Sequence, residues 1–241
     1  MPSLAAQLKQ LKKEIYDTRG FITQDPDCIA MLKAADKLAH RPEPVLITGE
    51  SGTGKELVAY RLHGRRTGRF IALSLSAMPD TMVQAELFGH VRGSYSGAVT
   101  SRMGLLVAAS KGTLFIDEIG EITPALQVML LRLIETHRFR RIGENEDTEF
   151  TGRFIFATNE LGSGFRDDLY QRISTFRLKT KPLRDRAADA KLILKGILTD
   201  AEIKDLLELA WKNTTFRGNV RELLRLAKQY KVLGRDYLDF R

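Results

Sequence analysis

Apolar positions along the chain follow two different periods. Short and nearly continuous apolar runs predict strands buried on both faces, at residues 45–48, 70–73, 113–116, 154–157 and 174–178. Helical stretches separate these runs, and the clearest has one apolar stripe formed by Leu126, Met129, Leu130, Leu133 and Ile134. Strands that alternate with helices in this way predict an α/β body, in which a parallel sheet is covered by helices on both faces in three layers.

Purely helical patterns flank this body. Before it, Leu4, Leu8, Leu11 and Ile15 predict an amphipathic helix, which either packs on the body or couples two subunits. Asp25-Pro26-Asp27 then predicts the start of a helix that ends near Ala39. After Lys181 no strand is expected, and helical spacing covers residues 192–198, 201–212 and 219–232. We therefore expect three parts: an N-terminal helix over 1–20, an α/β subdomain over 21–180 and a small helical subdomain over 181–241.

Composition and charge narrow the classes of protein that fit. With 43% hydrophobic and 28% charged residues and no long apolar stretch, the 241-residue chain is expected to be globular and to contain no membrane span. The single cysteine, Cys28, cannot form an internal disulfide, which fits a reducing cytoplasm. The net charge of +8 suits a polyanionic partner, either a nucleotide or a nucleic acid.

The strongest local motif lies between the first predicted strand and a helix that begins near Glu56. Its glycines and small residues allow backbone amides to surround a phosphate, and its lysine reaches the terminal phosphates of a nucleotide. The motif consists of Gly49, Glu50, Ser51, Gly52, Thr53, Gly54 and Lys55. The hydroxyl residue that commonly follows such a lysine and binds Mg²⁺ is replaced here by Glu56.

Polar residues follow two later strands. Asp117 ends an apolar strand and suits the Mg²⁺ shell of a nucleotide, and Glu118 suits polarisation of the attacking water. Such an acid pair is otherwise commonly only solvated. Asn159, which follows Thr158, suits contact with the γ-phosphate, although the same dipeptide is common in turns.

Arginines form the last group of candidates. Arg166 and Arg172 are expected on or beside one helix, where they either form surface salt bridges or act as arginines supplied to a neighbouring subunit. Two further basic clusters, near residues 61–69 and 137–141, are compatible with contact to promoter DNA. A solvated face or a ring interface is the explanation that we favour for both clusters.

Taken together, five segments resemble the central AAA+ domain of bacterial enhancer-binding proteins, the ATPases that activate sigma-54 RNA polymerase. The resemblance runs from about Phe21 to Val232 and includes a glutamate at the position of Glu56. The segments are 49–56, Glu86-Leu87-Phe88-Gly89-His90, 112–121, 165–170 and Gly218-Asn219-Val220-Arg221-Glu222-Leu223.

The resemblance implies an AAA+ P-loop fold with a helical lid and the hydrolysis of Mg-ATP. Lys55, Asp117 and Glu118 would bind and hydrolyse the nucleotide, with Asn159 as the first sensor. Arg166 and Arg172 match arginine fingers that act on the neighbouring subunit of a ring hexamer. Arg221 matches the second sensor, on a helix of the lid.

A glycine-bounded segment resembles the family loop that contacts sigma-54 during ATP turnover. Its residues are Gly93, Ser94, Tyr95, Ser96, Gly97 and Ala98. Three of them differ from the family sequence Gly-Ala-Phe-Thr-Gly-Ala but keep an aromatic tip and a hydroxyl. The expected partner is therefore the sigma-54 RNA polymerase holoenzyme, in the cytoplasm.

Other differences from the family sequence leave alternative functions open. Ser74 stands where the family has an asparagine that holds the catalytic glutamate, and Phe216-Arg217 replaces Trp-Pro. The chain ends at Arg241 without a helix-turn-helix, as expected for an excised core or for a minimal protein. The alternatives are an AAA+ regulatory module and a DNA-stimulated ATPase that acts on a different partner.

Overall fold

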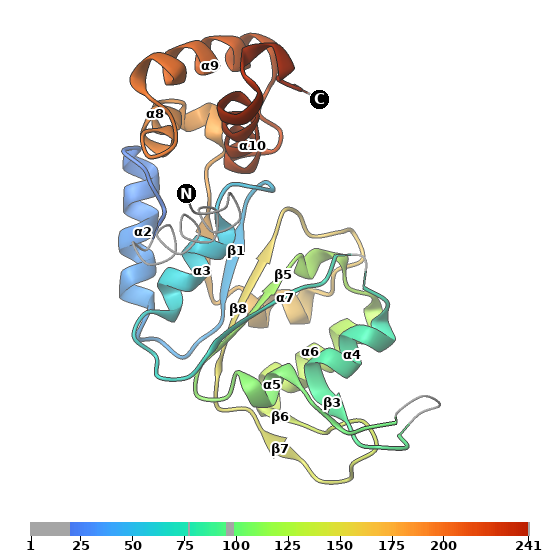
Figure 1. The fold of residues 1–241 in the computed structure, drawn as a ribbon. Coiled ribbons are helices and arrows are strands. Elements are labelled where there is room, and N and C mark those ends of the chain that lie inside the picture. The colour runs from blue at the N-terminus through green and yellow to red at the C-terminus, as the bar shows by residue number, and fades with distance from the viewer. Residues whose placement is uncertain (1–19, 77, 95–98, 241) are drawn as a thin grey trace. The chain divides into compact units, whose positions relative to one another are not determined.

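The computed structural model describes residues 20–76, 78–94 and 99–240 (Figure 1). Five strands form one sheet in the order β2-β5-β8-β1-β9, and the neighbouring pairs β2–β5, β5–β8 and β8–β1 are parallel. The strands are β1 (Val45–Thr48), β2 (Phe70–Ser74), β5 (Thr113–Asp117), β8 (Arg153–Thr158) and β9 (Phe176–Lys179). The predicted parallel α/β sheet is confirmed.

The core of this sheet consists of the apolar runs and stripes seen in the sequence. All six residues of β8 are buried, because a central strand is covered on both faces. The predicted helical stripe lies on α6 (Pro124–Thr136), which begins with Pro124 and with a hydrogen bond from Leu126 N to Thr123 Oγ1. Side chains of α6 enter the same core as those of α4 (Asp80–Phe88), α5 (Leu105–Ala108) and α7 (Asp167–Ile173).

Two short hairpins were not predicted. One pairs β3 (Gly89–His90) with β4 (Arg102–Met103), and the other pairs β6 (Arg138–Phe139) with β7 (Thr148–Glu149). Strands of two residues bury too few side chains to produce a period in the sequence. The hairpins also touch each other, since Val91 N donates to Ile142 O at 3.1 Å.

The C-terminal part is helical, as predicted, and has a core of its own. It contains the 3₁₀ turn η2 (Leu183–Arg186), α8 (Ala188–Leu194), α9 (Asp200–Asn213), α10 (Asn219–Leu233) and the 3₁₀ turn η3 (Arg235–Tyr237). The predicted helix over 192–198 was wrong in its position. Helix α8 ends before Gly196, which is unfavourable inside a helix, and the apolar residues after it form a turn onto Leu194 O.

Contacts divide the chain into two compact units. One contains residues 37–48 and 62–178, with the sheet except for the end of β9. The other joins the described residues up to Asp36 and the segments 49–61 and 179–240, with most of α2 (Pro26–Leu38), the start of α3 (Lys55–His63) and the C-terminal helices. The domain limits expected at residues 20 and 180 stay a prediction, and the expected N-terminal helix lies outside the described residues. No helix in the described ranges is long and apolar enough to span a membrane.

Candidate functional site

The predicted phosphate-binding loop begins at Gly49, directly after β1, and ends at Lys55, where α3 begins. Gly52 has a φ of +75°, and a Cβ there would lie 2.2 Å from the carbonyl oxygen of Gly218, so only glycine fits without strain. The Lys55 side chain is 5% exposed, and its Nζ donates to Gly49 O at 2.9 Å and to Glu50 O at 3.4 Å. The lysine therefore lies over the loop.

The two kinds of backbone group in this loop have different surroundings. The carbonyl oxygens of Gly49, Glu50, Ser51, Gly52 and Thr53 all accept hydrogen bonds from the protein. Within the described part of the chain, the amides of residues 51–54 donate to no acceptor. Successive amides that are left available in this way form a binding place for an anion, and the N-terminus of α3 adds to it.

Side chains from the C-terminal helical part surround the same loop. Arg184 donates to both carboxylate oxygens of Glu50, at 2.8 and 2.5 Å, and Asn219 Nδ2 donates to Glu50 Oε2 at 3.1 Å. These hydrogen bonds, with that of Arg184 the stronger, lower the pKa of Glu50 to about 2. Arg221 Nη1 donates to Ser51 Oγ at 3.1 Å, so the structure brings the predicted lid arginine to the phosphate loop.

The predicted acid pair lies at the carboxyl edge of the sheet. Asp117 ends β5 opposite Ser74, and Glu118 follows it with a left-handed φ of 58°. Glu118 N donates to Asp117 Oδ1 at 2.9 Å, and Asn159 N donates to Glu118 Oε2 at 3.4 Å. Ser74 Oγ donates to Ser76 Oγ at 3.5 Å. The ends of two neighbouring strands thus meet at Glu118, through the Asp117 carboxylate and the backbone amide of Asn159. The left-handed backbone of a non-glycine residue such as Glu118 has a cost, and residues of this kind cluster at functional sites.

The donor set at this edge fits Mg²⁺ held together with phosphates. Asp117 is half-buried, and while its Oδ1 accepts from Glu118 N, its Oδ2 has no hydrogen-bond partner within residues 20–76, 78–94 and 99–240. Among the described residues there is no group of three His, Cys, Asp or Glu residues that would enclose a metal ion by itself. Mg²⁺ commonly uses one or two carboxylates and completes its shell with water and substrate phosphates, so a single aspartate suits it.

Comparison with known proteins agrees with this geometry. Residues 21–179 match the family model described as the sigma-54 interaction domain. The chain belongs to the sigma-54 interaction domain family.

Several curated regulators are similar to this member of the family. The Nif-specific regulatory protein of Bradyrhizobium diazoefficiens is 39% identical over 236 residues, which cover 91% of this chain and 40% of that protein. The transcriptional regulatory protein GlrR of Escherichia coli is 37% identical over 238 residues, which cover 89% of this chain and 52% of that protein. The chain thus spans about half the length of the curated relatives it matches, or less.

Solved structures support the fold. The crystal structure of NtrX from Brucella abortus in complex with ATP has a TM-score of 0.76 and 23% identity, covering 95% of this chain and 57% of that one. The ADP complex of Saccharomyces cerevisiae Hsp104 has a TM-score of 0.61. The predicted AAA+ fold is confirmed.

The two predicted arginine fingers of this sigma-54 interaction domain lie at opposite ends of α7. Arg166 precedes the helix and binds Asp168 through two hydrogen bonds, at 3.0 and 2.6 Å. Arg172, in the last turn, pairs with Glu135 at 3.1 Å. Their side chains are 45% and 60% exposed. Both arginines are therefore accessible to a second molecule, while their role stays a prediction.

The predicted sigma-54 loop is described only at its start. Gly93 has a φ of +82°, and Ser94 N donates to Val91 O at 3.2 Å. Tyr95, Ser96, Gly97 and Ala98 lie outside the described residues. In the sequence the segment lies between β3 and β4, which pair with each other as antiparallel strands.

Sequence reasoning missed several residues that touch the phosphate loop, among them two whose side chains bond to its backbone carbonyls. Arg186 donates to Thr53 O at 2.9 Å, and Asn219 donates to Ser51 O at 3.0 Å. Asn219 lies in a recognised motif to which only an arginine role was assigned. No pattern in the sequence distinguishes Arg186 from the other basic residues near it.

Proposed function

We propose that this chain is an ATPase of the AAA+ type, which hydrolyses ATP to ADP and phosphate and remodels the sigma-54 RNA polymerase closed complex. The observation that carries the proposal is the phosphate loop, in which the carbonyls from Gly49 to Thr53 are bonded while the amides of residues 51–54 donate to no acceptor among the described residues. Membership of the sigma-54 interaction domain family supports the partner. The sigma-54-type relatives and the proposed polymerase partner support a place in the cytoplasm.

The roles of the residues follow from their chemistry. The loop amides and Lys55 bind the phosphates, and Lys55 must exchange the carbonyls of Gly49 and Glu50 for phosphate oxygens when ATP binds. Asp117 holds Mg²⁺, which neutralises charge on the phosphates. Glu118 orients the attacking water as a general base, and the backbone amide of Asn159 positions the Glu118 carboxylate.

We further propose that each site is completed by a neighbouring subunit in a ring hexamer. Arg166 and Arg172 are exposed, and each pairs with an exposed carboxylate, so exchanging these partners for a phosphate has a small cost. An arginine supplied in this way contributes about 10³–10⁵ to the rate of phosphoryl transfer. Arg221, at Ser51, reports the state of the loop to the lid.

The alternative of a DNA-stimulated ATPase is less well supported by the surface charges. Two of the three arginines of the β6–β7 hairpin are paired within the hairpin: Arg140 with Asp147 at 2.5 Å, and Arg141 with Glu144. Arg61 similarly pairs with Asp36 at 2.5 Å. Pairing reduces the charge available to a phosphate backbone.

The first experiment measures phosphate release at increasing protein concentration. We expect specific activity to rise steeply, and Lys55→Ala, Glu118→Gln and Arg166→Ala to reduce it at least a hundredfold. Arg140→Ala, which removes another exposed and paired arginine, is the control and should retain activity.

Mixing variants tests the shared site directly. Glu118→Gln subunits still carry Arg166, and Arg166→Ala subunits still carry Glu118, so a mixture should recover activity that neither variant has alone. Full turnover by Arg166→Ala alone would refute the shared site. Capture of the chain on immobilised sigma-54 with an ATP transition-state analogue, and its loss in Tyr95→Ala, tests the partner. No capture, or turnover that depends on DNA and falls steeply with salt, would favour the alternatives.

A further inference from the structure

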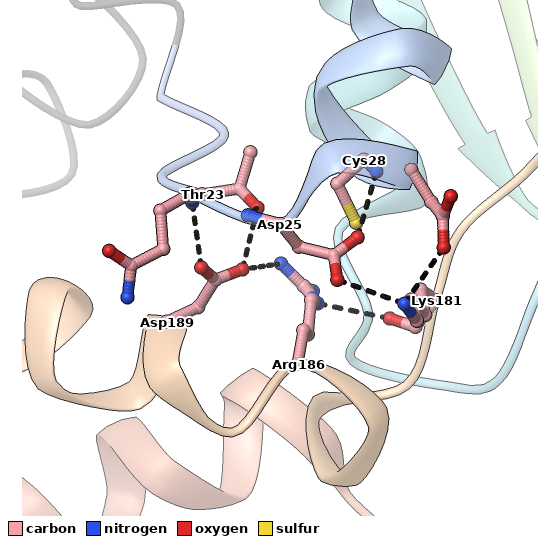
Figure 2. A network of polar contacts seen from close by, with 8 residues as sticks. Thr23, Asp25, Cys28, Lys181, Arg186 and Asp189 are labelled. Carbon is pink, nitrogen blue, oxygen red and sulfur yellow. Dashed lines mark hydrogen bonds and ion pairs between the residues drawn. The ribbon is translucent and has the colours of Figure 1, made fainter.

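A buried arginine connects three segments of the lid-containing unit. Figure 2 shows Arg186 and Asp189, which are 1% and 0% exposed and lie 3.4 Å apart. Asp189 also accepts hydrogen bonds from Thr23 Oγ1 at 2.6 Å and from Gln24 N at 2.8 Å. A buried arginine that is paired and hydrogen-bonded in this way is held in one orientation.

The remaining donors of Arg186 point to backbone carbonyls. Its Nε donates to Lys181 O at 3.1 Å, and its Nη2 donates to Thr53 O at 2.9 Å in the phosphate loop. The ring of Phe21 lies 4.7 Å from the guanidinium carbon. The planar guanidinium thus joins the linker before α8 to the loop, and a single ammonium group could not make the same set of bonds.

Asn219, at the start of α10, also holds a carbonyl of the phosphate loop. It is completely buried and has a left-handed φ of 51°, which asparagine tolerates better than most residues. Its Oδ1 accepts from Leu183 N at 2.7 Å, and its Nδ2 donates to Ser51 O at 3.0 Å and to Glu50 Oε2 at 3.1 Å. The next residue continues the contact, because Val220 N donates to Gly52 O at 3.1 Å.

Arg186, Asn219 and Val220 have one feature in common: each donates a hydrogen bond to a carbonyl of the phosphate loop. Three consecutive carbonyls, those of Ser51, Gly52 and Thr53, are bonded by groups from Asn219, Val220 and Arg186. A peptide plane is rigid, so fixing the direction of its carbonyl also fixes the direction of the adjoining amide. Carbonyls held by the lid therefore keep the amides available for phosphate.

We propose that Arg186 and Asn219 are positioning residues that preorganise the phosphate loop by holding its carbonyls. The inference rests on the proposed nucleotide binding and adds that the affinity for phosphates depends on the lid. Without these bonds the loop samples orientations in which carbonyls face the phosphates, and binding must first restore the productive one.

The test compares a ligand with phosphates and a ligand without them. ADP is titrated by calorimetry and adenosine by ligand-observed NMR, for wild type, Asn219→Asp and Arg186→Lys. Aspartate keeps the acceptor for Leu183 N and tolerates the left-handed backbone, but it cannot donate to Ser51 O. Its negative charge beside Glu50 would weaken ADP binding by itself, so the neutral variant Asn219→Gly is measured beside it and must show the same loss. Lysine keeps the positive charge beside Asp189, but it lacks the planar guanidinium that donates to both Lys181 O and Thr53 O. We expect ADP to bind about tenfold more weakly in each variant, as expected for one or two lost hydrogen bonds, with adenosine binding unchanged.

Controls separate this role from general stability. Lys181→Gln removes ion pairs of the same linker with Asp25 and Asp27, at 2.9 Å each, without a contact to the loop, and should leave ADP affinity unchanged. Asn219→Gly is compatible with the left-handed backbone, so position 219 still tests the inference if Asn219→Asp or Arg186→Lys fails to fold. Equal weakening of ADP and adenosine, or ADP affinity equal to wild type, would overturn the inference. A wild-type chain that binds no ADP would instead refute the proposed function itself, and the inference with it.

Discussion

Replacing Gly52 by alanine should strongly damage nucleotide binding. Gly52 has a φ of +75°, which an L-residue adopts at a cost of about 1–2 kcal/mol. Its added Cβ would also lie 2.2 Å from Gly218 O and 3.1 Å from Arg221 Cβ. Both neighbours belong to the start of α10, and a backbone carbonyl cannot rotate away as a flexible side chain can.

The expected loss of affinity follows from these two terms. In the free protein the loop of Gly52→Ala can relax out of the strained conformation, so nucleotide binding must restore it. The strain alone then weakens ADP binding about 5–30-fold, because 1.4 kcal/mol corresponds to a factor of ten. Displacement of Gly218 from the loop adds to this loss, since the carbonyl must move by about 1.2 Å to reach ordinary contact.

Calorimetric titration with ADP and thermal unfolding of the free protein measure both effects, with two alanine variants as controls. Gly234 has a φ of +87° and no atom near its added Cβ, so Gly234→Ala reports strain without a clash. Gly196 has neither a positive φ nor a near neighbour, so Gly196→Ala should be neutral. Both controls should bind ADP as wild type does. If Gly52→Ala also did so, the assignment of this loop to phosphate binding would be refuted.

Two further predictions concern charge and helix capping. Because Arg184 and Asn219 lower the pKa of Glu50 to about 2 from 4.5, its ionised form stabilises the fold fully above pH 4.5 and progressively less as pH falls towards 2. The difference in melting temperature between wild type and Glu50→Gln should therefore be constant near pH 7 and shrink in acid; a constant difference down to pH 2 contradicts this. Thr199 caps α9 in a capping box with Glu202, so Thr199→Ala should lower the free energy of unfolding by about 1 kcal/mol in denaturant titrations, while Thr199→Ser retains it.

Much of the sheet could be predicted because its inner strands β5, β8 and β1 are buried on both faces. Strands β1, β2, β5 and β8 produce continuous apolar runs, and each was expected within one or two residues of its observed limits. Strand β9 begins at Phe176 rather than Ser174, since Ser174 N still bonds to Tyr170 O at the end of α7. Periodicity locates the middle of an element better than its ends, where a few hydrogen bonds decide.

Elements with little local signal could not be predicted. In the two hairpins, β3 pairs with residues Arg102–Met103 and β6 pairs with residues Thr148–Glu149, across long connections. Two residues in each strand do not by themselves select such a distant partner. The position of α8 also depends on packing, since Leu194 and Leu198 share a core without sharing a helix.

The phosphate loop, the acid pair after β5 and the arginines beside α7 were all determined by local sequence, because their chemistry needs particular residues at particular spacings. Tertiary structure alone decided what surrounds the loop. Arg186 and Asn219 are more than 130 positions from the carbonyls they hold, and nothing in their own segments indicates that contact. Hydrogen bonds between distant segments depend on the folded path of the chain, so only the fold could reveal which residues orient the loop.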